Sequence, residues 1–148
     1  MKIAIASDHA GLELKNHLRL FLAGMEHEVA DLGAFTADPS DYPDFAEAVG
    51  KAVLSGAVER GILICGSGVG ASVAANKLKG IRAGLCHDSY SARQGVEHDD
   101  MNVLVLGSRV IGRALAEDLA RFFVQARFSG ELRHVGRLEK IRRLEDRG

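Results

Sequence analysis

Short apolar runs that alternate with longer amphipathic runs constrain the fold of this chain more than any other feature. The apolar runs have the length and composition of buried strands, at 2–7, 28–32, 61–65, 82–86 and 103–107. Between and after them, helical spacing of apolar residues predicts helices over about 14–24, 44–58, 71–78, 89–96 and 111–123. Strands that alternate with helices form parallel sheets with right-handed crossovers. We therefore expect an α/β fold: a three-layer α/β/α sandwich around a five-stranded parallel, Rossmann-like sheet.

A chain of 148 residues has room for one domain and one hydrophobic core. Nineteen basic and twenty acidic residues leave a net charge of −1, which argues against a surface built to bind nucleic acid or an anionic membrane. The charge is uneven, because 127–148 contains seven basic but only four acidic residues. We expect a single domain over 1–148, with a core at about 1–125 and a basic tail at about 126–148 that suits an anion.

No apolar run approaches the roughly 18 residues that a membrane helix needs. Met1 leads directly into a strand-like segment without the layout of a signal peptide. We expect a cytoplasmic protein with no membrane partner. In a reducing compartment, Cys65 and Cys86 are expected to be free thiols, which excludes a disulfide scaffold.

The tail contains a short apolar stripe, because Leu138, Ile141 and Leu144 recur every three residues. A short helix with one such stripe is unstable alone, so it must pack on something, and we expect a partner subunit. Arg133 and Arg137 lie on the same segment. Charge runs are usually solvated, yet the forked guanidinium group of arginine also fits a phosphate.

The carboxyl ends of parallel strands gather ligand-binding groups at one edge of a sheet. Four of the five predicted strands are followed by residues that can do chemistry: Asp8-His9, Cys65–Gly70, Cys86-His87-Asp88 and Gly107-Ser108-Arg109. An isolated Asp-His pair more often caps a helix than reacts. His98 has acidic neighbours but lacks the spacing of metal ligands, so we expect no metal. The role of His87 stays open.

The glycine-rich segment Gly66–Gly70 has three interpretations. Its glycines let several backbone N–H groups face one point, which suits an anion or a developing oxyanion. Gly66-x-Gly68-x-x-Ala71 also matches a dinucleotide fingerprint, with Asp88 near the position of a ribose-binding acid, which would make the chain a non-catalytic nucleotide-binding module. The motif follows the third strand rather than the first, which weakens that interpretation. A glycine turn that serves only packing is the third.

Cys65 immediately precedes this loop. A cysteine at the end of a core strand is often an inert small hydrophobe. Beside converging N–H donors, however, its thiolate could move a proton next to a carbonyl while the donors stabilise the enediolate. Both interpretations remain open on the residues alone.

Together these residues resemble a known family. The ordered set comprises Asp8-His9-Ala10-Gly11, Asp41-Tyr42-Pro43, Ile64-Cys65-Gly66-Ser67-Gly68-Val69-Gly70, Ala75-Asn76-Lys77, Gly80-Ile81-Arg82-Ala83, Glu97-His98, Gly107-Ser108-Arg109 and Arg133-His134-x-x-Arg137. It spans nearly the whole chain and resembles the type B ribose-5-phosphate isomerases and the related galactose-6-phosphate isomerases. Cys65 favours the ribose-phosphate branch, because the galactose branch usually lacks cysteine there.

The resemblance implies an aldose–ketose isomerase without metal or other cofactor that opens a furanose and moves a proton through a cis-enediolate. It implies Cys65 as the base, His98 in ring opening, and Asp8 holding sugar hydroxyls. The Ser67 hydroxyl and the N–H groups of Gly66, Gly68, Val69 and Gly70 would bind the enediolate oxygen. The phosphate-binding positions match His9, Arg109, Arg133 and Arg137, and Tyr42 would line the sugar pocket. The family works as a homodimer with sites at the subunit interface; pairing into tetramers is left open.

Three positions depart from the family pattern. Ser67 keeps the hydroxyl of the usual threonine. Asp99 stands where asparagine is usual, so this substrate-binding position has a carboxylate in place of an amide. Glu131-Leu132 replaces Gly-Gly before Arg133. We therefore expect ribose 5-phosphate and ribulose 5-phosphate as substrate and product, with a four- or six-carbon sugar phosphate, such as erythrulose 4-phosphate or allose 6-phosphate, as the alternative.

Overall fold

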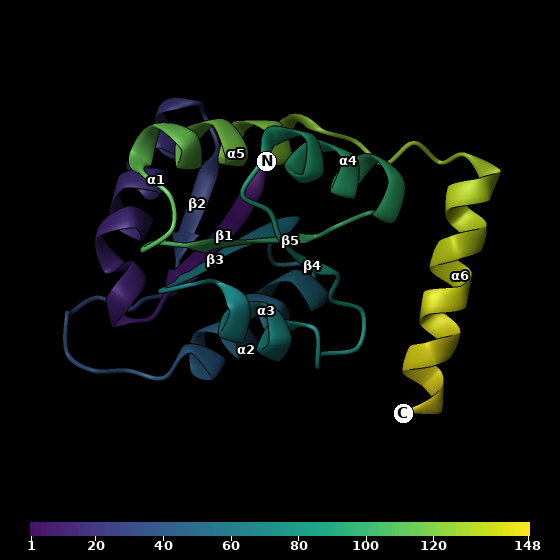
Figure 1. The fold of residues 1–148 in the computed structure, drawn as a ribbon, viewed down its shortest axis with the longest axis horizontal. Helices are drawn as coiled ribbons and strands as arrows, with labels where there is room; N and C mark the ends of the chain where they lie inside the picture. Colours follow the sequence, from purple (N-terminus) through teal and green to yellow (C-terminus); the bar gives the residue numbers. More distant parts are fainter.

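The computed structural model describes all residues, 1–148, and contains one five-stranded sheet. The strands are β1 (Lys2–Ser7), β2 (Glu28–Asp31), β3 (Arg60–Cys65), β4 (Ala83–Leu85) and β5 (Val103–Gly107). Every pair of neighbouring strands is parallel, in the order β2-β1-β3-β5-β4. The predicted parallel α/β sheet is confirmed (Figure 1).

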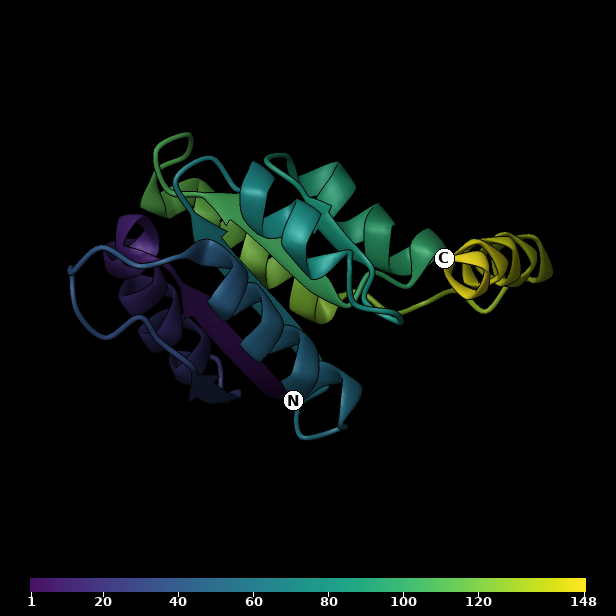
Figure 2. The ribbon, with the colours of Figure 1, turned by 90° about the horizontal axis from the view of Figure 1, so that it is seen from below.

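Helices cover both faces of this sheet. They are a short 3₁₀ helix η1 (His9–Gly11) and α1 (Leu12–Gly24), α2 (Tyr42–Leu54), α3 (Val69–Ala75), α4 (Ser89–Asp99), α5 (Arg113–Gln125) and α6 (Leu132–Arg147). One face is covered by α1, α4 and α5, and the other by α2 and α3 (Figures 1 and 2). The result is the expected three-layer sandwich, to which α6 is attached at one end.

The central strands are buried on both sides, which explains why their sequences are apolar without alternation. In β3, Ile62 and Ile64 pack in the cluster beneath α1, α4 and α5. The intervening Leu63 and Cys65 pack in the cluster beneath α2 and α3. Because successive side chains of a strand point to opposite faces, Cys65 ends β3 on the α2/α3 side.

The strand order creates a switch point between β1 and β3. From β1 the chain winds to β2 at one edge, whereas β3 and the later strands lie on the other side. Loops that leave neighbouring strands in opposite directions open a crevice at the carboxyl ends, where α/β proteins bind ligands. Asp8 follows β1 and Cys65 ends β3, so both residues are at this crevice.

Several helix boundaries differ from the sequence prediction, most clearly in α2, α3 and α4. The helix α2 begins two residues earlier, because a proline is well tolerated in the first turn, where Pro43 lies. It also ends earlier, at Leu54, ahead of Gly56 with φ +80°. The helix α3 ends at Ala75 because the Asn76 side chain pairs with both backbone groups of Ala83 in β4. The helix α4 continues to Asp99 and therefore includes His98.

The tail forms a 16-residue helix that extends from the core at the end where the strands begin (Figure 1). The linker before it is held by Arg60, whose guanidinium donates to the carbonyl oxygens of Phe123 and Ala126. The apolar stripe of α6 is largely open, with Leu144 63 % exposed. No helix of the chain combines the length and apolar character that crossing a membrane requires.

Candidate active site

A pocket of about 330 Å³ opens at the switch point, and we call it the carboxyl-end pocket. It is lined from four segments by Asp8, Tyr42, Cys65, Gly66, Ser67, Gly70, Arg109 and Val110. Apart from Val110, all of these residues belong to the predicted site. Segments as far apart in the sequence as Asp8 and Val110 meet here because the strands that precede them are neighbours in the sheet.

Cys65 is the best-placed reactive group of this pocket. Its side chain is only 4 % exposed and packs in the α2/α3 core, yet the residue lines the pocket. The backbone N–H of Gly68 donates to Cys65 Sγ, with 3.2 Å between nitrogen and sulfur. The sulfur is thus held against the glycine-rich loop at the boundary between the core and the pocket.

The glycine at position 68 is required by the backbone. Its φ is +83°, in the left-handed region that side chains rarely adopt. A Cβ atom there would also lie 2.6 Å from Leu85 Cδ1 and 3.1 Å from the carbonyl carbon of Leu106. The close approach to β5 and the left-handed turn together direct the Gly68 N–H to the sulfur.

Several backbone donors of the same loop have no acceptor within the chain. They are the N–H groups of Gly66, Ser67, Gly70 and Ala71. Val69 differs, because its N–H donates to Ser67 Oγ. Free N–H groups beside a reactive sulfur can donate hydrogen bonds to an anionic oxygen, so the predicted oxyanion site has available donors.

Three side chains enclose the pocket. Asp8 is 7 % exposed and accepts the Gly11 N–H through Oδ1, which leaves its second oxygen without a partner in the chain. The ring of Tyr42 covers Gly70 so closely that a Cβ atom there would lie 2.5 Å from the ring. Arg109 covers the loop on another side, because a Cβ atom at Gly66 would lie 3.4 Å from Arg109 Nη1.

His9 lies next to the pocket and is held by Ser40. The backbone N–H of His9 donates to Ser40 Oγ at 3.0 Å, and the backbone N–H of Ser40 donates to His9 Nδ1 at 3.1 Å. Because Nδ1 accepts a hydrogen bond, the neutral ring has its proton on Nε2. His9 lines an adjacent depression together with Ser108 and Arg113.

The other predicted residues form a separate group on α4 and α6: His98, Asp99, Arg133 and Arg137. The helix α4 ends just before β5 begins, whereas Cys65 pairs with Gly107 at the far end of β5. From Val103 to Gly107 the strand alone extends about 13 Å. Within one chain, these four residues are therefore not part of the carboxyl-end pocket.

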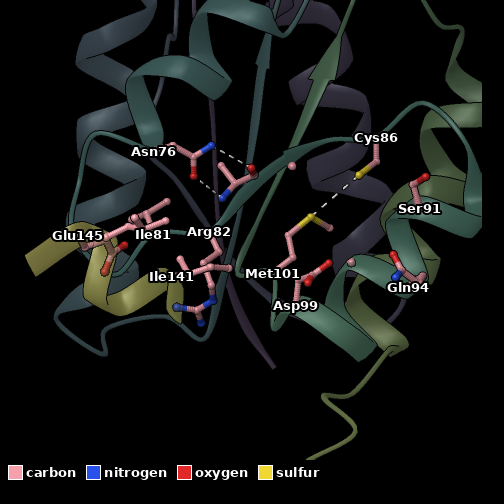
Figure 3. Close-up of a pocket in the computed structure, with 14 residues that line it drawn as sticks. Asn76, Ile81, Arg82, Cys86, Ser91, Gln94, Asp99, Met101, Ile141 and Glu145 are labelled. Carbon is pink, nitrogen blue, oxygen red and sulfur yellow. Dashed lines mark hydrogen bonds between the residues drawn. The ribbon is translucent and has the colours of Figure 1, made fainter. Parts of the chain in front are cut away.

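A second cavity, the α4/α6 groove, lies between α4, α6 and the edge strand β4. It has a volume of about 500 Å³, and Figure 3 shows Ser91, Gln94 and Asp99 of α4 on one side and Ile141 and Glu145 of α6 on another. The lower part of α6 is tied here by the Gly80 N–H, which donates to Glu145 Oε1 at 3.1 Å, and by the ion pair between Lys79 and Asp146.

Cys86 also lines this groove, but its environment differs from that of Cys65. Burial, followed by the nearby Asp88, raises its pKa to about 11. It is therefore a neutral thiol at pH 7, and it contacts Met101 through sulfur at 4.0 Å. Asp88 itself caps α4 by accepting the Ser91 N–H at 2.7 Å. This N-capping role accounts for the presence of Asp88 without a bound ribose.

Three residues without a predicted role hold predicted site residues in place, and a fourth, His87, holds the end of β5. Ser40 holds His9, Gln94 and His134 contact His98, and His87 Nε2 accepts the Gly107 N–H at 3.0 Å just past the end of β4. In the sequence, His134 stands out only as part of the family motif, and the role of His87 stays open. No sequence signal marks Ser40 or Gln94, because their partners are defined by packing. No group of three or more His, Cys, Asp or Glu side chains is arranged to hold a metal ion.

Comparison with known proteins identifies the family to which this chain belongs. A family model described as Ribose/Galactose Isomerase matches residues 3–141. The chain belongs to the ribose/galactose isomerase family. Ribose-5-phosphate isomerase B of Escherichia coli is 44 % identical over 146 residues, which are 99 % of this chain and 97 % of that protein. The expected family resemblance is confirmed.

A second relative and a solved structure are also similar to this chain. The D-erythrulose-4-phosphate isomerase of Pectobacterium atrosepticum is 39 % identical, covering 88 % of this chain and 86 % of that protein. The structure of ribose-5-phosphate isomerase B from Clostridium thermocellum superimposes with a TM-score of 0.97 at 48 % identity, over 99 % of both chains. The chain is a sugar-phosphate isomerase of the aldose–ketose type, and the non-catalytic nucleotide-binding alternative is wrong.

Proposed function

We propose that this isomerase interconverts ribose 5-phosphate and ribulose 5-phosphate through a cis-enediolate, with Cys65 as the base. The hydrogen bond from the Gly68 N–H to Cys65 Sγ, beside a row of free N–H groups, is the observation that supports the proposal most. Base and oxyanion donors must lie on two sides of one reacting carbon. The carboxyl-end pocket offers both groups within a single loop.

The proposed reaction begins with the open-chain aldose in this pocket. The Cys65 thiolate removes the proton from C2, and the electron pair moves onto the carbonyl oxygen at C1 to form the enediolate. The hydroxyl proton of O2 passes to O1, and Cys65 returns its proton to C1. The product is the ketose, with the carbonyl at C2, and the thiolate is regenerated.

The free donors of the loop supply the electrostatic part of this mechanism. A proton next to a carbonyl is far less acidic than a thiol, so the base alone is insufficient. Each well-placed donor contributes about 2.7–4 kcal/mol at the transition state. The Ser67 hydroxyl adds a further donor at the same loop, and Asp8 binds sugar hydroxyls with its unpaired oxygen. Tyr42 closes the pocket over Gly70.

The phosphate and ring-opening groups come from two chains in this proposal. Arg109 and His9 lie by the pocket of one chain. His98, Asp99, Arg133 and Arg137 of the same chain are too far from its Cys65, so they serve the pocket of a second copy. A two-fold dimer satisfies both sites at once, because each chain gives to its partner what it receives.

The exposed apolar surface agrees with such a dimer. Ile141 and Leu144 on α6 are open to the α4/α6 groove, while Val69, Val73 and Val110 are exposed around the carboxyl-end pocket. A helix with an unpaired apolar stripe needs a packing partner to be stable. The proposal therefore assigns α6 both to dimerisation and to phosphate binding.

Turnover of a panel of sugar phosphates tests the substrate. We expect the highest kcat/KM on ribose 5-phosphate, with weaker activity on erythrose 4-phosphate and allose 6-phosphate. A higher kcat/KM on the four- or six-carbon substrate would reassign the substrate and make Asp99 the first residue to exchange, since its carboxylate would then select the hydroxyl pattern. No activity on any pentose phosphate would refute the proposal.

Complementation tests the shared site. Cys65→Ala and His98→Asn chains are each expected to be nearly inactive as homodimers. After the two are unfolded together and refolded, mixed dimers contain one site with both residues intact, so about one quarter of wild-type activity should return. The matched control mixes Cys65→Ala with Cys65→Ser. Failure to recover activity in verified mixed dimers would place the site within one chain.

A further inference from the structure

The imidazole ring of His98 is held from two directions within its own chain. Its face stacks on the ring of His134, with 4.1 Å between ring centroids and 24° between planes. Its Nδ1 lies 2.9 Å from Nε2 of Gln94, one helical turn earlier on α4. A partly exposed histidine near a helix end normally samples several rotamers, so two such contacts restrict it strongly.

His134 is itself firmly anchored. Although it belongs to the largely exposed helix α6, its side chain is only 1 % exposed. Ser129 Oγ contacts its Nδ1 at 2.5 Å, and the Ser129 N–H donates to the carbonyl oxygen of Glu97 at 2.9 Å. The linker thus fastens His134 to the end of α4, next to His98.

His134 Nε2 has no hydrogen-bond partner in the chain. Buried polar atoms are almost always paired, and an unpaired one needs a reason. The contact of Nδ1 with Ser129 Oγ accounts for an imidazole at this position. The stack on His98 accounts for a flat ring.

The contact with Gln94 determines where the proton of His98 resides. An amide nitrogen donates and does not accept, so His98 Nδ1 is the acceptor. The neutral ring then carries its proton on Nε2, which makes no hydrogen bond in the chain. That is the form of imidazole that can donate a proton to a sugar ring oxygen as the ring opens.

We propose that Gln94 and His134 are positioning residues for His98: Gln94 places the proton on Nε2, and His134 fixes the plane of the ring. This inference rests on the proposed ring-opening role of His98, and it goes beyond that role by assigning the groups that prepare His98 for it. Gln94 is the cleaner test, because its side chain forms its only hydrogen bond with His98 and none with α6.

The tautomer can be read directly by ¹⁵N NMR of the full-length protein with labelled histidines, where the His98 signals are identified by their loss in His98→Asn. We expect neutral His98 to be protonated on Nε2. Gln94→Leu should give a mixture of tautomers, and Gln94→Glu should move the proton to Nδ1, because a carboxylate accepts from it. Gln125→Leu, at an exposed site on α5, is the matched control and should leave the His98 spectrum unchanged.

Kinetics on ribose 5-phosphate separate positioning from a purely structural effect. Gln94→Leu should lower kcat about tenfold, with KM within about twofold of wild type, because the phosphate-binding arginines are untouched. Gln94→Glu should lower kcat further. His134→Phe keeps a stacked ring and should retain more of kcat than His134→Ala.

Distinct outcomes overturn the inference and the proposal beneath it. A neutral His98 protonated on Nδ1, or a Gln94→Leu variant with unchanged tautomer and kcat, refutes the Gln94 half. Equal kcat for His134→Phe and His134→Ala refutes the stacking half. If His98→Asn keeps full activity, the ring-opening role of His98 fails, while the NMR result still decides whether Gln94 sets the tautomer.

Discussion

The carboxyl-end pocket and the α4/α6 side of the molecule are built in different ways. The pocket grows out of the buried sheet, and Cys65 and Asp8 are both less than a tenth exposed. On the other side, Arg133 and Arg137 are exposed on a helix that is attached to the core by one hydrogen bond, one ion pair and the stack of His134 on His98. Groups that need sub-ångström geometry thus lie on rigid core elements, whereas groups that bind a remote charge lie on an appended segment.

The two cysteines show the same contrast between the regions. Cys65 accepts a backbone N–H from a glycine loop at the pocket. Cys86 faces the α4/α6 groove, and burial raises its pKa to about 11. A buried cysteine at the carboxyl end of a strand is therefore not reactive by position alone; the backbone donor at the sulfur distinguishes Cys65 from Cys86.

The largest effect is expected when the proposed base of the carboxyl-end pocket is removed. Cys65→Ala should lower kcat by roughly 10²–10⁴-fold, because it removes the proposed base. Binding of a non-reactive sugar phosphate, measured by calorimetry, should change little. Cys86→Ala is the matched control and should keep wild-type turnover. Near-normal turnover by Cys65→Ala would assign the proton transfer to another residue.

Deletion of 132–148 removes α6 and should abolish the functions proposed for the α4/α6 side. Without α6, the proposed phosphate contacts and the dimer contact are lost together, so kcat/KM should fall by about 10²-fold or more. Size-exclusion chromatography with light scattering should show a monomer, and circular dichroism should show a retained α/β core. A truncated chain that stays a fully active dimer would contradict the role given to the tail.

Arg137→Ala tests the α4/α6 side alone, because it removes a proposed phosphate contact and leaves the proposed proton-transfer groups of the carboxyl-end pocket intact. We expect KM to rise about tenfold while kcat changes little, since the arginine binds the phosphate equally in substrate and transition state. Arg147→Ala, at the end of the same helix, is the control. A fall in kcat with unchanged KM would place Arg137 in the chemical step instead.

The smallest expected effect is on the pH dependence of the free energy of unfolding, through His134, which attaches the tail. Burial, and then the charges of His98, Arg133 and Arg137, lower the pKa of His134, against the opposing charge of Glu131. Below pH about 6.5, His134 binds a proton more readily in the unfolded chain than in the folded chain. The free energy of unfolding should therefore decrease as the pH falls. Urea unfolding at pH 5.5 and 8 should show a smaller pH dependence for His134→Phe than for wild type. An identical dependence would show that His134 titrates alike in both states.

Much of the fold was predictable because its signals are local. The apolar run of β3, the glycines after it and the spacing of α5 each lie within a few consecutive residues. Helix ends were less predictable: α2 and α3 end where Gly56 and Asn76 make turns and contacts that apolar spacing does not report. The neighbourhood of Cys65 was predictable for the same local reason, since Gly68 is only three residues away.

The sequence by itself determined the alternation of strands and helices and the glycine loop that follows Cys65, because backbone propensity and apolar periodicity act over short stretches of chain. Only the tertiary structure decided the order of the strands, the separation of His98 from Cys65, and the contacts of Ser40 with His9 and of His134 with His98. These pairs lie 31 and 36 residues apart, and which of them meet depends on how whole layers pack, a choice that no local pattern encodes.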